Sequence, residues 1–273
     1  MMEARHAALR YWRILAGIAR REALRFVLQR ERFIAALVRP LVWLLVFAAG
    51  FRAVLGVSII PPYQTYVTYD VYIVPGLVGM IQLFHGMQSS LAMVYDREMG
   101  GMRILLTTPA PRWFLLLARH LAGGAISLPQ VYVFLSVARG FGVSLPAWGY
   151  VAVLPALLLT GLMLGALGML LSATIRQLEN FAGVMNFVIF PMFFASSALY
   201  PLWRIEESSE WLYLACTFNP FTHAVELIRF SLYLTPNVEA LAAVGFSLVL
   251  FFVGAALAYR PSAGFQKGTG GRG

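Results

Sequence analysis

Residues 96–109 read Asp96-Arg97-Glu98-Met99-Gly100-Gly101-Met102-Arg103-Ile104-Leu105-Leu106-Thr107-Thr108-Pro109 and separate two long apolar segments. A loop that only joins two membrane helices needs little more than a few small polar residues. This one carries charges of both signs and paired glycines, and then a short apolar run that a proline ends. The wider connection, residues 95–112, is here called the hinge. Its pattern predicts a cytoplasmic surface that another protein contacts.

Apolar segments on both sides of the hinge predict an all-α integral membrane protein. Hydrophobic residues make up 60% of the chain and charged residues 12%, whereas about a quarter of residues are charged in soluble proteins. A helix crosses the hydrocarbon core with about 20 mainly apolar residues. No stretch remains for a separate soluble domain, so residues 37–258 are expected to form one transmembrane domain. Its six spans are expected at residues 37–57, 71–94, 113–138, 150–172, 181–202 and 237–258.

The distribution of basic residues predicts the topology. The chain has 21 Lys and Arg residues and a net charge of +9. Nine of the arginines lie in residues 1–39, and others lie in the hinge and in the tail, residues 259–273. This is the positive-inside bias of a protein with both termini in the cytoplasm. We therefore expect a multi-pass protein of the plasma (inner) membrane whose basic residues contact anionic lipids, and no nucleic-acid partner.

The N-terminal residues 1–36 are expected to form a cytoplasmic leader. Within residues 8–32, apolar side chains recur at helical spacing and arginines occupy another face, which is typical of an interfacial helix on the inner leaflet. A disordered basic leader is the alternative. Arg39-Pro40 is then expected to begin the first span, because proline is tolerated in a first helical turn. The apolar face consists of Trp12, Leu15, Ala19, Ala23 and Phe26.

The second span carries a stripe of polar side chains, namely Gln82, His85 and Ser89. Their spacing of three and four residues places them on one helix face. Lipid penalises such a face, so it is expected to pack on protein, including a dimer partner, or to line a translocation path. No second histidine or carboxylate lies near His85 at metal-ligand spacing, so we expect no metal site.

Residues 203–236 form the least regular region. A break at Asn219-Pro220 precedes a segment, Phe221–Leu234, that looks helical but is too polar to span comfortably. Non-helical backbone at membrane depth requires cover by protein or contact with water. We interpret the region as a re-entrant or interfacial hairpin on the outer face, with a plain extracellular loop as the alternative. Glu226 and Arg229 are three residues apart and are expected to pair across one helical turn.

Four segments in this order resemble the ABC-2 type permeases, the membrane subunits of ABC exporters such as drug, nodulation-factor and polysaccharide exporters. The resemblance extends over essentially the whole chain. The segments are the leader with Arg39-Pro40-Leu41-Val42-Trp43-Leu44-Leu45, the hinge, Ser196-Ser197-Ala198-Leu199-Tyr200-Pro201-Leu202, and Asn219-Pro220-Phe221-Thr222-His223-Ala224-Val225-Glu226-Leu227-Ile228-Arg229.

The resemblance implies a fold like that of the type V exporters and a dimer of six-helix subunits, either identical or different. It also implies two copies of a cytosolic ATP-binding subunit beneath them. In that family the segment matching residues 97–108 is the coupling helix that contacts the ATPase, and the segment matching residues 211–234 closes the outer end. The residues expected to carry the coupling are Arg97, Glu98, Arg103, Ile104, Leu105 and Leu106.

The chain is not expected to be an enzyme. It contains no G-x-x-x-x-G-K-[ST] phosphate loop, and its only lysine is Lys267. We expect no catalytic residue and no cofactor on this chain, with ATP and Mg²⁺ held by the partner subunit. The sequence therefore predicts the permease of an exporter that moves an amphiphilic or lipid-linked substrate outward.

Two alternatives remain. A secondary transporter or channel usually has carboxylates within its spans, and the expected spans hold no Asp or Glu at mid-depth. The other alternative is an ABC-2-like subunit that serves the assembly of a complex and transports no cargo. The same sequence features fit this role.

Overall fold

The computed structural model describes residues 2–28, 30–51, 56–57, 61–98, 111–175 and 177–258. Within these residues the chain is almost entirely helical, with one short pair of antiparallel strands. The elements are α1 (Met2–Leu28), α2 (Arg30–Phe51), β1 (Gly56–Val57), β2 (Val67–Thr68), α3 (Tyr69–Glu98), α5 (Arg112–Gly140), α6 (Gly149–Ala152), α7 (Leu154–Thr174), α8 (Leu178–Phe194), α9 (Leu202–Ser208), α10 (Glu210–Phe218), α11 (Pro220–Leu232) and α12 (Val238–Ala258).

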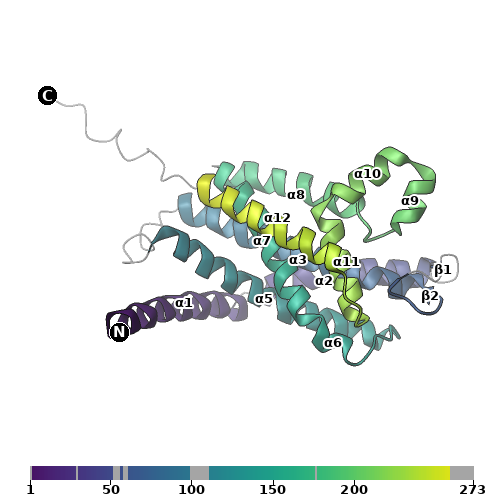
Figure 1. The fold of residues 1–273 in the computed structure, drawn as a ribbon, viewed down its shortest axis with the longest axis horizontal. Coiled ribbons are helices and arrows are strands. Elements are labelled where there is room, and N and C mark those ends of the chain that lie inside the picture. The colour runs from purple at the N-terminus through teal and green to yellow at the C-terminus, as the bar shows by residue number, and fades with distance from the viewer. Residues whose placement is uncertain are drawn as a thin grey trace.

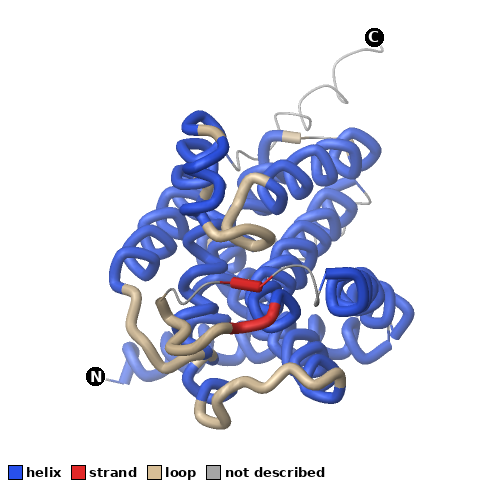
Figure 2. The backbone as a smooth tube through the Cα atoms, turned by 90° about the vertical axis from the view of Figure 1, so that its right-hand side faces the viewer, coloured by secondary structure: helices blue, strands red, loops and turns tan. Residues whose placement is uncertain are grey.

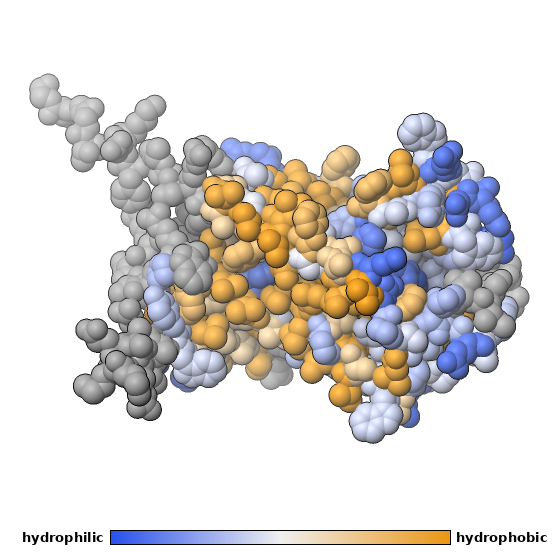
Figure 3. Space-filling view, viewed as in Figure 1, coloured by the Kyte–Doolittle hydropathy of each residue, from blue (hydrophilic) through white to orange (hydrophobic). Residues whose placement is uncertain are grey.

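The long helices form an elongated bundle whose two ends differ (Figure 1). Helix α1 lies at one end, whereas β1, β2, α6 and α9 lie toward the other. Figure 2, which looks at this second end, shows most of the loops gathered there. An apolar band lies between the ends on the face drawn in Figure 3. An apolar surface of this kind is suited to contact with the lipid tails of a bilayer.

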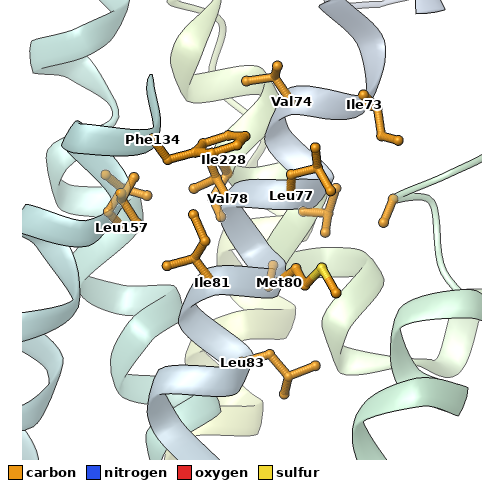
Figure 4. Close-up of a cluster of buried hydrophobic side chains, with 14 of the residues drawn as sticks. Ile73, Val74, Leu77, Val78, Met80, Ile81, Leu83, Phe134, Leu157 and Ile228 are labelled. Atoms are coloured by element: carbon orange, nitrogen blue, oxygen red, sulfur yellow. The ribbon is translucent and has the colours of Figure 1, made fainter. Parts of the chain in front are cut away.

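Helix α3 forms the centre of the bundle. Nearly every side chain from Tyr72 to Leu83 is buried, because α2, α5, α7, α8 and α11 all pack around it. Figure 4 shows its apolar side chains pointing in several directions, toward Phe134 of α5, Leu157 of α7 and Ile228 of α11. A helix buried on all sides needs no polar face, which explains its long apolar sequence.

Four of the six expected spans correspond to helices that are long and apolar enough to cross a membrane. In the part of the chain that the structure describes, these are Tyr69–Tyr95, Phe114–Gly140, Gly149–Thr174 and Val238–Ala258. The other two expected spans correspond to shorter apolar stretches, Leu37–Phe47 and Asn180–Phe194. Six complete spans therefore stay a prediction.

The expected bounds of the first and fifth spans were wrong. Helix α2 begins at Arg30, so Pro40 lies inside it rather than in its first turn. Helix α8 ends at Phe194 instead of continuing to residue 202. The carbonyls of Met192 and Ala195, which a longer helix would use, accept hydrogen bonds from the Asn219 side chain instead.

The leader is helical, as expected. The Tyr11 ring lies 4.8 Å from the Phe114 ring of α5, and Ile14 and Ile18 are half-buried. Of the predicted apolar face, Trp12 is 65% exposed, whereas Leu15 and Ala19 are half-buried. The expected boundary of the leader at residue 36 falls inside α2. The position of α1 on the inner leaflet stays a prediction.

Candidate functional site

The hinge connects two helices that pack against each other. Arg97 and Glu98 belong to the last turn of α3, and α5 begins at Arg112. Figure 1 shows both helix ends at the end of the bundle away from β1 and β2. Arg103, Ile104, Leu105 and Leu106 lie outside the described residues. The proposed coupling contacts therefore stay a prediction.

Gln82, from the polar stripe, joins α3 to α7. Its Nε2 donates to the Leu157 carbonyl at 2.6 Å, and the Thr160 hydroxyl donates to its Oε1 at 2.6 Å. The side chain is buried. A buried amide with both ends satisfied holds two helices in one register, because shifting either helix would leave polar groups unpaired.

His85 joins α3 to α5. Its Nε2 lies 3.0 Å from the Gly123 carbonyl, and its Nδ1 lies 3.1 Å from Oε1 of Gln130. The carbonyl can only accept, so Nε2 is the donor in the first contact. Nδ1 is then an acceptor in the neutral ring, which requires the Gln130 amide to turn its NH₂ group toward the ring. Ser89, one turn later, is half-buried near Gly123.

Glycines bring the same helices unusually close together. A Cβ atom built on Gly86 would lie 2.9 Å from the backbone nitrogen of Gly165 in α7. Close approach of this kind is common where small residues meet in membrane helices. The stripe thus packs against α5 and α7 of the same subunit. A role in a translocation path or a dimer contact stays a prediction.

Arg229 organises a second polar cluster, toward the end that carries β1 and β2. It is 3% exposed and forms an ion pair with Glu226, as their spacing predicts. Its Nη2 donates to the Ser197 carbonyl at 2.8 Å, and its guanidinium lies 4.2 Å from the centre of the Tyr72 ring. The buried cation therefore has an anion, a carbonyl and an aromatic face as partners, which compensates its loss of water.

Asn219 ties α8 to α11. Its Oδ1 accepts from the Phe221 N–H at 2.9 Å and caps α11, in which Pro220 occupies the first turn. Its Nδ2 donates to the carbonyls of Met192 at 2.7 Å and Ala195 at 2.6 Å. The predicted break at Asn219-Pro220 is confirmed. The Asn219 side chain supplies hydrogen-bond partners for the C-terminal end of α8 and the N-terminal end of α11.

Two tyrosines complete this cluster, and the sequence interpretation missed their role. The Tyr69 hydroxyl donates to the Leu199 carbonyl at 2.7 Å, and the Tyr72 hydroxyl donates to the Ser197 carbonyl at 3.0 Å. Nothing in their spacing indicates partners more than a hundred residues away. We call Tyr69, Tyr72, Ser197, Asn219, Glu226 and Arg229 the Arg229 cluster.

The described residues contain no group of three or more His, Cys, Asp and Glu side chains that could hold a metal ion. The site is built instead from helix-to-helix hydrogen bonds and close packing. Residues 15–233 match the family model of the ABC-2 type transporter. The chain belongs to this family. Membership, together with several apolar helices, makes it a multi-pass membrane protein.

Several relatives are similar to this ABC-2 chain. The ycf38 protein of Cyanophora paradoxa, whose name describes it as a transport permease, is 27% identical over 202 residues, covering 72% of this chain and 66% of that protein. Nodulation protein J of Rhizobium leguminosarum bv. trifolii is 26% identical over 238 residues, covering 82% of this chain and 84% of that protein.

A third relative, YbhR of Escherichia coli strain K12, is named as a probable multidrug ABC transporter permease. It is 25% identical over 170 residues, covering 61% of this chain and 45% of that protein. The chain thus spans just under two thirds of the ycf38 relative and less than half of YbhR.

Proposed function

We propose that this chain is the permease subunit of an ATP-binding cassette exporter, and that it moves an amphiphilic or lipid-linked substrate outward. The observation that carries the proposal is the family match over residues 15–233. It coincides with a bundle in which residues 99–110 connect two packed helices, α3 and α5. The names of the ycf38 protein and YbhR agree with a transport role.

Energy is proposed to reach the bundle through the hinge. The sequence contains no phosphate loop, so ATP and Mg²⁺ would bind to a separate cytosolic subunit, present in two copies. Glu98 and Arg103 would form ion pairs at the edge of a groove in that subunit, and Ile104, Leu105 and Leu106 would fill it. Closure of the ATP-binding subunits would then favour one of two arrangements of the membrane helices.

We propose that both termini and the hinge lie in the cytoplasm, and that the protein resides in the inner membrane. Nine arginines in residues 1–39 support this orientation through the positive-inside rule. The helical leader lies toward the same end of the bundle as the end of α3 and the start of α5, which flank the hinge (Figure 1). The helices α9, α10 and α11 would then close the outer end as a re-entrant segment.

A second copy of the permease is part of the proposal, and the surface of α8 supports it. Asn186 is exposed halfway along this apolar helix, next to Phe187, which is 77% exposed. A side-chain amide facing lipid tails leaves its hydrogen-bonding groups unpaired, whereas a neighbouring subunit supplies partners. A homodimer contact on this face of α8 would give the Asn186 amide its hydrogen-bond partners.

The experiment is a mild-detergent purification of the tagged chain from its native membrane, with identification of the proteins that accompany it. We expect a stoichiometric ATP-binding protein. Leu105→Arg should remove it, because a charge would enter an apolar contact. Ser208→Arg, an exposed position in α9, is the matched control and should retain it. A folded oligomer that brings no ATPase would contradict the exporter function and favour secondary transport or an assembly role.

A further inference from the structure

A narrow cavity lies between α3, α5 and α7, beside the polar stripe. Glycines from the three helices, including Gly86, Gly123, Gly161 and Gly165, leave room there. The space open to the centre of a water-sized sphere is about 20 Å³, and about 10–15 Å³ measured in this way suffices for one water molecule. The cavity is therefore too small for a transported amphiphile and fits a single small ligand.

His120 lines this cavity with a ring nitrogen that has no partner. The residue is 8% exposed, and its Nε2 is buried without a hydrogen bond in the part of the chain that the structure describes. The His120 ring packs against α7: a Cβ atom built on Gly165 would lie 3.3 Å from Nδ1. In the neutral tautomer whose proton is on Nδ1, the buried Nε2 presents a lone pair.

His85 lines the same cavity but differs in this respect. Both of its ring nitrogens have protein partners, Gln130 and the Gly123 carbonyl. The unfilled acceptor is thus a property of His120 and not of every histidine in the bundle. A ligand that donates a hydrogen bond is what this acceptor requires.

Two serine hydroxyls can hold such a ligand from the other side. Ser90 Oγ donates to the Gly86 carbonyl at 2.9 Å, which leaves its own lone pairs available. Ser89 Oγ lies against Gly123, 3.2 Å from where a Cβ on that glycine would lie. Both serines belong to the cavity lining. With His120 they provide the two to four polar partners that a buried water molecule needs.

We propose that this cavity binds one water molecule, which donates to His120 Nε2 and contacts the hydroxyls of Ser89 and Ser90. Leaving a buried acceptor without a partner is costly, and a bridging water is nearly as good as a direct hydrogen bond. Met93 and Met169 also line the cavity, and their flexible side chains can admit the water.

The water site lies between the two helices that flank the hinge, so it bears on coupling; this step rests on the proposed function. Ser90 lies eight residues before the end of α3 at Glu98, and His120 lies eight residues after α5 begins at Arg112. Each distance is about 12 Å along a helix. The water thus links the two helices that carry the hinge. Since a water can exchange partners, the link lets α3 and α5 shift without leaving His120 unpaired.

The test is solid-state NMR of the full chain in phospholipid bilayers, with ¹⁵N-labelled histidine and arginine and magnetisation transferred from water protons. We expect stronger transfer to His120 Nε2 than to either ring nitrogen of His85, whose nitrogens already have protein partners and which serves as the internal comparison. The guanidinium of Arg139, exposed at the end of α5, is the positive control. The His120 and His85 signals are assigned with His120→Gln and His85→Gln.

Signal at Arg139 with none at His120 would overturn the proposal, and so would equal transfer to His85 and His120, because that indicates a general water channel. Ser89→Ala should weaken the transfer to His120, and Gly183→Ala, whose added methyl meets nothing within 4 Å, should leave it unchanged. This readout needs neither ATP nor a partner, so failure of the exporter function would leave it intact.

Discussion

Arg229 and Ser197 lie thirty-two residues apart, and Nη2 of Arg229 donates to the Ser197 carbonyl at 2.8 Å. The Tyr72 hydroxyl donates to the same carbonyl at 3.0 Å. One carbonyl in the irregular segment after α8 therefore receives donors from α11 and from α3. Because a carbonyl has two lone pairs, this atom fixes three parts of the chain relative to one another.

The single cysteine offers a way to measure the stability of the fold. Cys216 is fully buried, and burial raises the pKa of its thiol. The thiolate is the reactive form, so a maleimide dye should label the native chain slowly and the unfolded chain rapidly. Dye fluorescence during heating of detergent-solubilised protein checks this. Rapid labelling at low temperature would contradict the burial of Cys216.

Arg229→Met should destabilise the chain by about 1.5–3 kcal/mol, the usual worth of a hydrogen bond to a charged group. The change leaves Glu226 and the Ser197 carbonyl short of a partner. The measurement is the midpoint of Cys216 labelling on heating. Arg139→Met, at an exposed arginine, is the control and should change little. Adding Glu226→Gln to Arg229→Met should recover part of the loss, because the buried carboxylate is then neutral.

Two substitutions at Asn219 separate its two roles. Asn219→Ser keeps an oxygen that caps α11 but is too short to donate to the carbonyls of Met192 and Ala195, whereas Asn219→Ala loses both interactions. We expect Asn219→Ala to cost about 1 kcal/mol more than Asn219→Ser, the typical value of an N-cap. The Cys216 assay measures both. Equal costs would mean that the cap on α11 contributes nothing measurable.

Gly86→Ala should destabilise the packing of α3 on α7 by about 1–3 kcal/mol, as overpacking of a tight core does. The new methyl would meet the Gly165 backbone at 2.9 Å, and backbone cannot move aside as a flexible side chain can. Gly183→Ala, in open space, should change the midpoint little. An unchanged midpoint for Gly86→Ala would show that α3 and α7 separate easily.

Cysteine accessibility checks the proposed orientation. In a Cys216→Ala background, Ser208→Cys in α9 should react with a membrane-impermeant maleimide added to intact cells. Lys267→Cys in the C-terminal tail should react only after the membrane is opened. The expectation follows from the positive-inside distribution of arginine. The reverse pattern would place α9, α10 and α11 in the cytoplasm and refute the proposed outer closure.

The sequence by itself determined the class of fold and most of the helices. Apolar runs of sufficient length gave four helices whose bounds agree with the expected spans within a few residues. Asn219-Pro220 indicated the break before α11, because capping is local chemistry between neighbouring residues. The three-residue spacing of Glu226 and Arg229 indicated their ion pair for the same reason.

Only the tertiary structure decided which distant groups meet. The end of α8 depends on the Asn219 amide, and the partners of Tyr69 and Tyr72 lie 130 and 125 residues away. The sequence also indicated an apolar face on the leader, but it did not indicate that Tyr11 packs on Phe114 of α5. Hydrophobic periodicity reports that a helix has a face, but packing against a particular neighbour determines which residues that face contains. The same applies to His120, whose lone pair becomes significant only because three helices close around it.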